Sequence, residues 1–188
     1  MKDKITKIFA ESRLVQEATA RENADAIVAA VDVIVQSIKK DGKVIVFGNG
    51  GSAADSQHIA AEFLGRFAKE RRSIAAVALT TDTSAMTAIG NDYGFDKIFV
   101  RQMEGLGRKG DVALAISTSG NSANVIEAVK LAKKLGIKTI ALVGNTGGQL
   151  AALADVKIVV PSKVTARIQE SHICVAHSIC ELVEEQFC

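Results

Sequence analysis

From Gly42 onward, short apolar runs alternate with stretches whose apolar residues recur at helical spacing. The runs cover residues 43–47, 74–79, 111–116, 137–143 and 156–160, and all of them are continuous. Continuous apolar runs are typical of strands that helices cover on both faces. Helices are predicted over residues 52–66, 81–90, 97–107, 121–135, 147–153 and 165–187. The alternation predicts an α/β fold with a five-stranded parallel sheet of order 2-1-3-4-5 and right-handed crossovers.

The first 40 residues carry apolar side chains at helical spacing and contain no strand pattern. Ile5, Ile8 and Phe9 begin one apolar stripe, and a wider apolar face runs along residues 22–40. We therefore expect a pair of N-terminal helices. The wider face fits either packing on the domain or an interface between subunits. No linker or change of composition divides the chain, so residues 1–188 are expected to form a single domain.

Two predicted strands run into loops of the same kind. The first loop is Gly48-Asn49-Gly50-Gly51-Ser52, the second is Ser117-Thr118-Ser119-Gly120-Asn121-Ser122, and a helix start follows each. In the predicted strand order, the two loops flank one crevice at the carboxyl ends of the strands. Free backbone N–H groups at helix starts bind anions. The pattern predicts a phosphorylated small molecule held between the loops.

Other interpretations of the two loops are weaker. The first loop matches the dinucleotide fingerprint G-x-G-x-x-G/A, but the acidic residue expected about 20 positions later is missing. A lysine-bearing nucleotide loop is also absent from the sequence. The second loop also fits a helix cap followed by a polar turn. Its hydroxyl groups favour a phosphate cradle, and they belong to Ser117, Thr118, Ser119 and Ser122.

Three side chains beyond the first loop suggest acid–base chemistry. His58 and Glu62 share a helix face at i, i+4. A surface ion pair would account for this spacing, but the apolar character of the helix favours a cleft. His177 lies among apolar residues of the last helix, where a buried imidazole needs a partner such as Glu62. With Glu62 as base and His177 as acid, the pair favours aldose–ketose isomerisation. The same histidine and glutamate side chains, with Gln169, could equally bind a metal ion.

Charge and composition narrow the range of partners. The chain has 23 basic and 21 acidic residues, a balance that argues against a nucleic-acid partner. We interpret Arg71-Arg72 as part of a solvated loop. Cys174, Cys180 and Cys188 are expected to be thiols in a reducing cytosol. The sequence shows no signal-peptide core and no apolar run of the ~20 residues that span a bilayer, so we expect a cytoplasmic protein without membrane contact.

Motifs spread over essentially the whole chain resemble those of one enzyme family. They are Phe47–Ser52, His58-x-x-x-Glu62, Gly65-Arg66, Asn91-Asp92-Tyr93-Gly94-Phe95, Ile116–Ser122 and Arg167-Ile168-Gln169-Glu170-x-His172. Together they resemble the phosphoheptose isomerases, also called sedoheptulose-7-phosphate isomerases, of the sugar isomerase (SIS) domain superfamily. The serine loop alone marks the superfamily, whereas the combined set is typical of the heptose branch and its close relatives.

The resemblance implies an activity and an assembly. The activity is the conversion of D-sedoheptulose 7-phosphate to D-glycero-D-manno-heptose 7-phosphate through an enediol, the first step toward the ADP-heptose or GDP-heptose precursors of bacterial lipopolysaccharide core or capsule. The assembly is a homotetramer with active sites at subunit interfaces.

The resemblance also implies residue roles. The residues matching the phosphate site are Ser52, Ser117, Thr118, Ser119 and Ser122. Those matching other substrate contacts are Asn49, Gly50, Gly51, Glu62, Asn91, Asp92 and Gln169. Glu62 and His177 match the base and the acid, and the zinc ligands of metal-bearing members match His58, Glu62, Gln169 and His177.

One spacing bears on the zinc ligands. Gln169 and His177 are about 12 Å apart along a straight helix. Both reach one ion only if the helix bends, the side chains stretch or different subunits supply them.

Three other functions compete with the isomerase. A related protein that binds the bacterial replication initiator lacks the acid–base pair, so Glu62 and His177 favour the enzyme. A second alternative is a different SIS enzyme, such as a hexulose- or arabinose-phosphate isomerase or an etherase. The Asn91-Asp92 segment and the Gln169 region favour the heptose branch over these enzymes, through resemblance alone. A SIS-type transcription regulator needs a helix-turn-helix module, and the first 40 residues are too apolar and too short for one.

Overall fold

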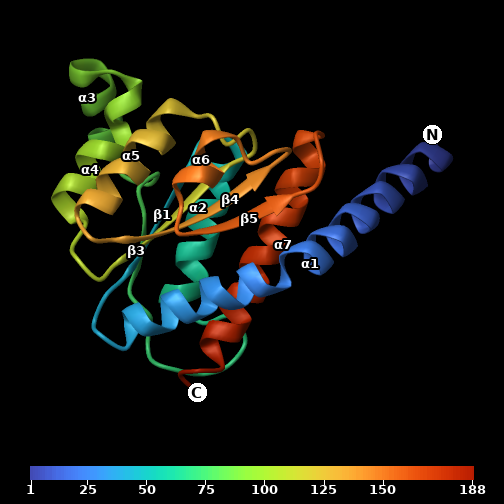
Figure 1. Ribbon diagram of the computed structural model, residues 1–188, viewed down its shortest axis with the longest axis horizontal. Helices are drawn as coiled ribbons and strands as arrows, with labels where there is room; N and C mark the ends of the chain where they lie inside the picture. Colours follow the sequence, from blue (N-terminus) through green and yellow to red (C-terminus); the bar gives the residue numbers. More distant parts are fainter.

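The core of the protein is a parallel sheet whose strand order matches the sequence-based prediction. The structure is a computed structural model that describes residues 1–188 (Figure 1). The five strands are β1 (Val44–Gly48), β2 (Ala76–Ala78), β3 (Val112–Ser117), β4 (Lys138–Gly144) and β5 (Val156–Val160). Their order is β2-β1-β3-β4-β5, and every neighbouring pair is parallel. The predicted strands and their order are confirmed, although the edge strand β2 is shorter than its apolar run.

Helices cover both faces of the sheet and divide the core into two clusters. They are α1 (Lys2–Ile38), α2 (Gly51–Leu64), α3 (Thr83–Tyr93), α4 (Ile98–Leu106), α5 (Ala123–Lys134), α6 (Gly148–Leu153) and α7 (Thr165–Glu184), with a short 3-10 turn, η1 (Phe95–Lys97), before α4. Val46 faces the cluster that α1, α2 and α7 cover. Its neighbours Ile45 and Phe47 face the cluster under α4, α5 and α6. Burial on both faces is the reason for the continuous apolar runs.

The expected pair of N-terminal helices is wrong, because α1 is one continuous helix of 37 residues. The segment before Gly42 contains neither glycine nor proline, so nothing in it terminates a helix. Asn23 explains the polar middle of α1: its amide donates to the Val159 carbonyl at 3.0 Å and accepts from the Val159 N–H at 2.8 Å. Asn23 thereby pairs with the open backbone edge of β5.

The two halves of α1 have different surroundings. The apolar face of the second half is buried in the core, with Ala30 and Ile34 fully covered, so it packs on the domain. The first half stands clear of the sheet (Figure 1), and it exposes Ile5 at 52% and Phe9 at 70%. None of the helices combines the length and the apolar character needed to cross a membrane.

The loop after α2 also departs from its expected environment. The interpretation of Arg71-Arg72 as a solvated pair is wrong for Arg71, whose side chain is 1% exposed and ion-paired with Glu184. Glu184 is separated from Arg71 by more than 100 positions. A local sequence pattern could not have revealed this pairing.

Candidate active site

The two Gly/Ser loops meet at the carboxyl ends of β1 and β3. These strands are neighbours, with Gly48 in register with Ile116. Asn49 of the first loop and Asn124 of α5 exchange two side-chain hydrogen bonds, at 2.8 and 2.9 Å. Asn124 is 2% exposed, so this amide pair is a buried brace that sets the spacing of the loops.

The hydroxyl groups of the second loop are organised by one another. The Ser117 and Ser122 hydroxyls lie 3.0 Å apart, and the Ser117 oxygen accepts the Gly120 N–H at 3.2 Å. Ser122 occupies the position that precedes α5, but its hydroxyl makes no capping hydrogen bond there. The helix-cap interpretation is therefore wrong for Ser122. Thr118 is half-buried and Ser119 is exposed, and the Ser119 hydroxyl oxygen accepts the Asn121 N–H at 3.2 Å.

The backbone around Gly120 has little freedom to change. Gly120 has a φ of +67°, and a Cβ at this position would collide with the carbonyl group of Gly147. The start of α6 also holds the loop, because the Leu150 N–H donates to the Gly120 carbonyl at 2.9 Å. Gln149 N–H donates to the Asn121 side chain at 3.1 Å. The loop is thus held in shape before any ligand arrives.

The first loop turns sharply into α2. Gly50 has a φ of +57°, and a Cβ on Gly48 would lie 2.7 Å from the Ile116 carbonyl oxygen. Ser52 is 3% exposed. The amide of Gln169, from α7, packs directly on Gly51, so Gln169 lies at the N-terminal end of α2.

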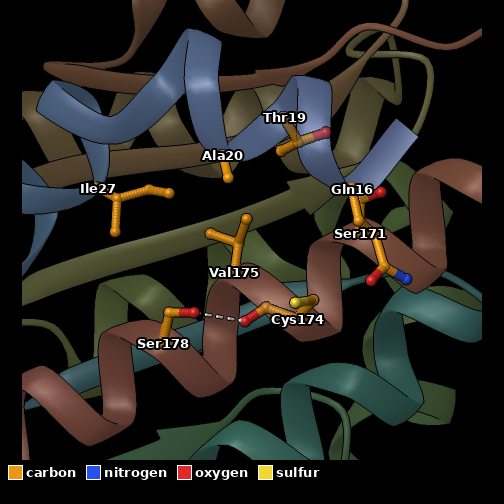
Figure 2. Close-up of a pocket in the computed structure, with 8 residues that line it drawn as sticks. All are labelled: Gln16, Thr19, Ala20, Ile27, Ser171, Cys174, Val175 and Ser178. Carbon is orange, nitrogen blue, oxygen red and sulfur yellow. Dashed lines mark hydrogen bonds between the residues drawn. The ribbon is translucent and has the colours of Figure 1, made fainter. Parts of the chain in front are cut away.

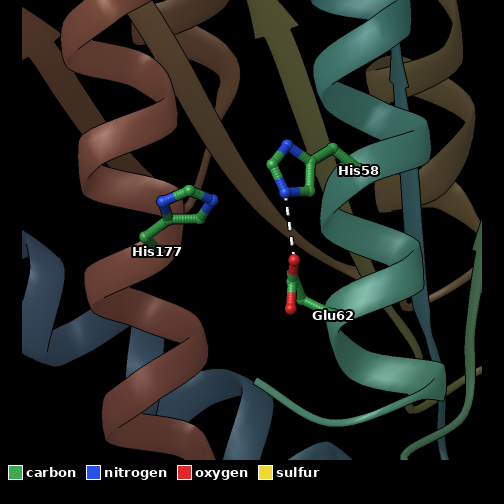
Figure 3. A group of neighbouring side chains, drawn as sticks. All are labelled: His58, Glu62 and His177. Carbon is green, nitrogen blue, oxygen red and sulfur yellow. Dashed lines mark hydrogen bonds and ion pairs between the residues drawn. The ribbon is translucent and has the colours of Figure 1, made fainter. Parts of the chain in front are cut away.

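His58, Glu62 and His177 form a cluster between α2 and α7 (Figure 3). One ligand atom from each lies within 4.8 Å of those of the other two. The His58 Nε2 and Glu62 Oε1 atoms are 3.0 Å apart, and the His58 and His177 rings meet edge-on with centroids 4.9 Å apart. The His177 Nε2 atom is buried without a hydrogen-bond partner. The cluster therefore offers two imidazoles and a carboxylate to one small volume.

Burial shifts the pKa of three groups on α2 and α7. Burial raises the pKa of Asp55, one turn before His58, against the positive charge of the two histidines. Burial also raises the pKa of the Cys180 thiol to about 12, and the charge of Glu62 adds to the effect. The pKa of His172 shifts in the opposite direction, because burial lowers it to about 4. Cys180 and His172 are therefore neutral near pH 7 and do not supply charge to the site.

Three predicted residues lie apart from the cluster. Gln169 is in contact with Gly51, and eight residues of helix, about 12 Å, separate it from His177. Asn91 and Asp92 are exposed at the C-terminal end of α3, where the Asn91 amide donates to Asp92 at 2.8 Å. Within one chain, the structure brings together His58, Glu62 and His177.

Two features of the site escaped the sequence analysis. Asn124 has no local signal beyond its place after the second loop, because its partner Asn49 lies 75 positions away. The Phe67 ring packs against His177 with centroids 5.5 Å apart, and only the return of the loop after α2 toward α7 makes this contact.

A hollow of about 50 Å³ lies between α1 and α7 (Figure 2). Its lining residues are Gln16, Thr19, Ala20, Ile27, Ser171, Cys174, Val175 and Ser178. Inside it, the Ser178 hydroxyl donates to the Cys174 carbonyl at 3.0 Å. The lining contains neither a carboxylate nor an imidazole, so this hollow lacks the acid–base groups of the cluster between α2 and α7.

Comparisons with known proteins converge on one family. The SIS domain family matches residues 8–144. The chain is 55% identical over 188 residues to the phosphoheptose isomerase of Aquifex aeolicus (strain VF5), covering 100% of this chain and 98% of that protein. The structure of phosphoheptose isomerase from Neisseria gonorrhoeae superposes with a TM-score of 0.93 at 49% identity over 98% of both chains. The Francisella tularensis phosphoheptose isomerase superposes with the same TM-score at 39% identity over 97% of both chains.

Gly120→Ala is expected to weaken anion binding at the second loop. The new methyl group would push against the Gly147 carbonyl group and would force alanine into a positive φ. We expect the affinity for sugar phosphates, measured by calorimetry, to fall by about tenfold or more. A tenfold loss corresponds to ~1.4 kcal/mol of binding free energy. Gly105→Ala is the matched control, because a Cβ there meets open space. Equal affinities in the two variants would contradict a preformed phosphate loop.

Proposed function

Since the chain belongs to the phosphoheptose isomerases of the SIS domain family, we propose that it converts D-sedoheptulose 7-phosphate to D-glycero-D-manno-heptose 7-phosphate. The observation that carries the proposal is the grouping of Glu62 and His177, with His58, within 4.8 Å. Helix α2, which carries His58 and Glu62, starts directly from the first of two loops whose backbone suits an anion. A phosphate grip beside a carboxylate and an imidazole suits an aldose–ketose isomerase. The reaction would be the first step toward the heptose of bacterial surface glycans.

The two loops have separate roles in this proposal. The second loop, Ser117–Ser122, binds the phosphate through hydroxyls and backbone N–H groups, together with Ser52. The first loop, Asn49–Gly51, presents its backbone to the sugar, with Gln169 packed on Gly51. Because the Asn49–Asn124 pair joins the loops, anchoring the phosphate also fixes the position of the sugar carbons. Asn91 and Asp92 are assigned to substrate contact from the family resemblance alone.

The proton transfers follow from the chemistry of the pair. Glu62 removes a proton from C1 of the open-chain ketose, and His177 donates a proton to the carbonyl oxygen on C2. The resulting enediol has a C1–C2 double bond and a hydroxyl on each carbon. Glu62 then returns its proton to C2, and His177 takes the O1 proton as the C1 carbonyl forms. His58, 3.0 Å from the Glu62 carboxylate, orients the base.

The donor set of the cluster also fits zinc. Two imidazoles and a carboxylate are the ligands of open zinc sites, and the buried Nε2 of His177 has no other partner. We propose that His58, Glu62 and His177 hold the ion, with Gln169 completing the set only where its helix geometry or another subunit allows. Bound zinc supplies Lewis acidity toward the substrate carbonyl.

The exposed surfaces support an assembly of several chains. The first half of α1 leaves Ile5 and Phe9 uncovered, and an apolar stripe of this kind gains from burial. The cluster is also open in a single chain, with the His58 side chain 47% exposed. We propose the homotetramer of the family, with neighbouring chains closing each site. Three free cysteines fit the reducing cytoplasm in which we place the enzyme.

Glu62→Gln and His177→Ala are expected to lower turnover by about 10²- to 10⁴-fold, the usual contribution of general acid–base catalysis. NMR of the sugar products measures the rate, while calorimetry and circular dichroism should show retained substrate binding and folding. Glu181→Gln, at an exposed position of α7, is the control. Near-normal rates in either site variant would place the proton transfers elsewhere. A wild-type protein without turnover would favour the non-catalytic alternative that binds the replication initiator.

Zinc affinity gives a test that does not depend on turnover. Loss of a residue that only hydrogen-bonds to a metal ligand costs about 10- to 100-fold in metal affinity. Because His58 is proposed to bind zinc directly, we expect His58→Ala to weaken zinc binding by more than that. Competition with a chromophoric chelator measures it, with Glu181→Gln again as control. Unchanged affinity would remove His58 from the ligand set.

Phe9→Glu tests the role of α1. A charge in the exposed apolar stripe should disfavour its burial between chains, so light scattering after gel filtration should detect a smaller species and turnover should fall with it. Lys7→Glu changes charge at a polar position of the same helix and should leave the assembly intact. A Phe9→Glu protein of unchanged mass would place the interface elsewhere.

A further inference from the structure

A buried carboxylate at the end of α7 holds the loop that follows α2. Glu184 is 2% exposed. Its two oxygens accept the backbone N–H groups of Phe67, Ala68 and Lys69, at 2.8, 2.8 and 2.7 Å. Three consecutive N–H groups on one carboxylate fix the path of the loop backbone.

The partner of Glu184 holds the end of α2 itself. The Arg71 side chain is 1% exposed, and its Nε atom lies 3.3 Å from the Glu184 carboxylate. Its Nη2 donates to the Glu62 carbonyl at 2.8 Å, and its Nη1 donates to the Phe63 and Gly65 carbonyls at 3.0 and 3.1 Å. The last carbonyls of a helix have no partner within the helix, and here the guanidinium supplies one.

Burying the charges of Arg71 and Glu184 costs free energy unless both groups are paired and hydrogen-bonded. Burial alone would raise the pKa of Glu184, but the three backbone hydrogen bonds and the charge of Arg71 outweigh it and leave the pKa below its usual value. Buried ion pairs often stabilise a fold no better than apolar residues of similar volume. A role in geometry therefore accounts for this pair better than a role in stability alone.

We propose that Arg71 and Glu184 are positioning residues that hold Glu62 and His177 in their reactive arrangement. Arg71 binds the backbone carbonyl of Glu62. Glu184 lies two helical turns after His177 on α7 and grips the N–H of Phe67, whose ring packs 5.5 Å from the His177 ring. The Arg71–Glu184 ion pair thus connects the end of α2, which carries Glu62, with α7, which carries His177. The role in turnover rests on the proposed isomerase function, whereas the effect on the His177 ring does not.

The chain contains a matched ion pair that serves as a control. Asp111 is 3% exposed and accepts the backbone N–H groups of Lys43 and Arg108 at 3.0 and 2.8 Å. The Lys43 ammonium lies 2.6 Å from it. Asp111 and Lys43 lie at the amino ends of β3 and β1, opposite the proposed site. Asp111→Asn therefore damages a comparable buried network without approaching Glu62 or His177.

The test compares Glu184→Gln and Arg71→Lys with Asp111→Asn in the full-length protein. Glu184→Gln places an amide NH₂ among backbone N–H donors, and Arg71→Lys keeps the charge but loses the planar fork. We expect both to lower kcat for sedoheptulose 7-phosphate by about 10- to 100-fold, the cost of small misplacements, while KM stays within about twofold because the phosphate loops are untouched. The NMR signals of the His177 ring protons should shift as Phe67 moves. Asp111→Asn should lower the melting temperature without either change.

The outcomes separate the two proposals. Normal kcat and unshifted His177 signals in the Glu184 and Arg71 variants would overturn the positioning role, as would equal losses of kcat in Asp111→Asn. Should Glu184→Gln fail to fold, Arg71→Lys decides by the same criteria. If the wild-type protein lacks turnover, the isomerase function fails. His177 shifts confined to the Glu184 and Arg71 variants would then still support the positioning of the cluster.

Discussion

The pairing of β1 with β3 as neighbouring parallel strands is the constraint on which the site depends. Parallel strands end at the same edge of a sheet, and the register of Gly48 with Ile116 brings both polar loops to that edge side by side. The Asn49–Asn124 pair then holds the loops at one spacing. A strand order in which β1 and β3 were not neighbours would separate the loops and leave two unrelated polar turns.

The reactive groups reach their cluster by different routes. His58 and Glu62 lie on the helix that follows the first loop, on the side of α2 that faces α7. His177 arrives from the last helix of the chain, after the polypeptide has crossed the whole sheet. The docking of α7 beside α2 therefore creates the cluster, and the buried contacts of Arg71 and Glu184 lie at the C-terminal ends of these helices. The packing that buries α7 in the core therefore also brings His177 to His58 and Glu62.

Buried carboxylates hold two segments of the backbone in place. Asp111 joins the amino ends of β1 and β3, and Glu184 joins α7 to the loop after α2. Each accepts backbone N–H groups and faces a basic side chain, so its desolvation is compensated locally. Both networks use a charged group to hold backbone segments in place.

The fold class and the loops could be predicted from the sequence because they depend on spacing over a few residues. Continuous apolar runs report burial on both faces, and the i, i+4 spacing of His58 and Glu62 places them on one face of any helix. The pair of N-terminal helices was predicted wrongly because the polar segment around Asn23 resembles a boundary until its contact with Val159 is known. Arg71 was assigned to solvent for the same reason, since its partner lies on the last helix. Only the tertiary structure decided the environments of Asn23, Arg71 and Asn124, because hydrogen bonds between distant segments leave no periodic trace in the sequence.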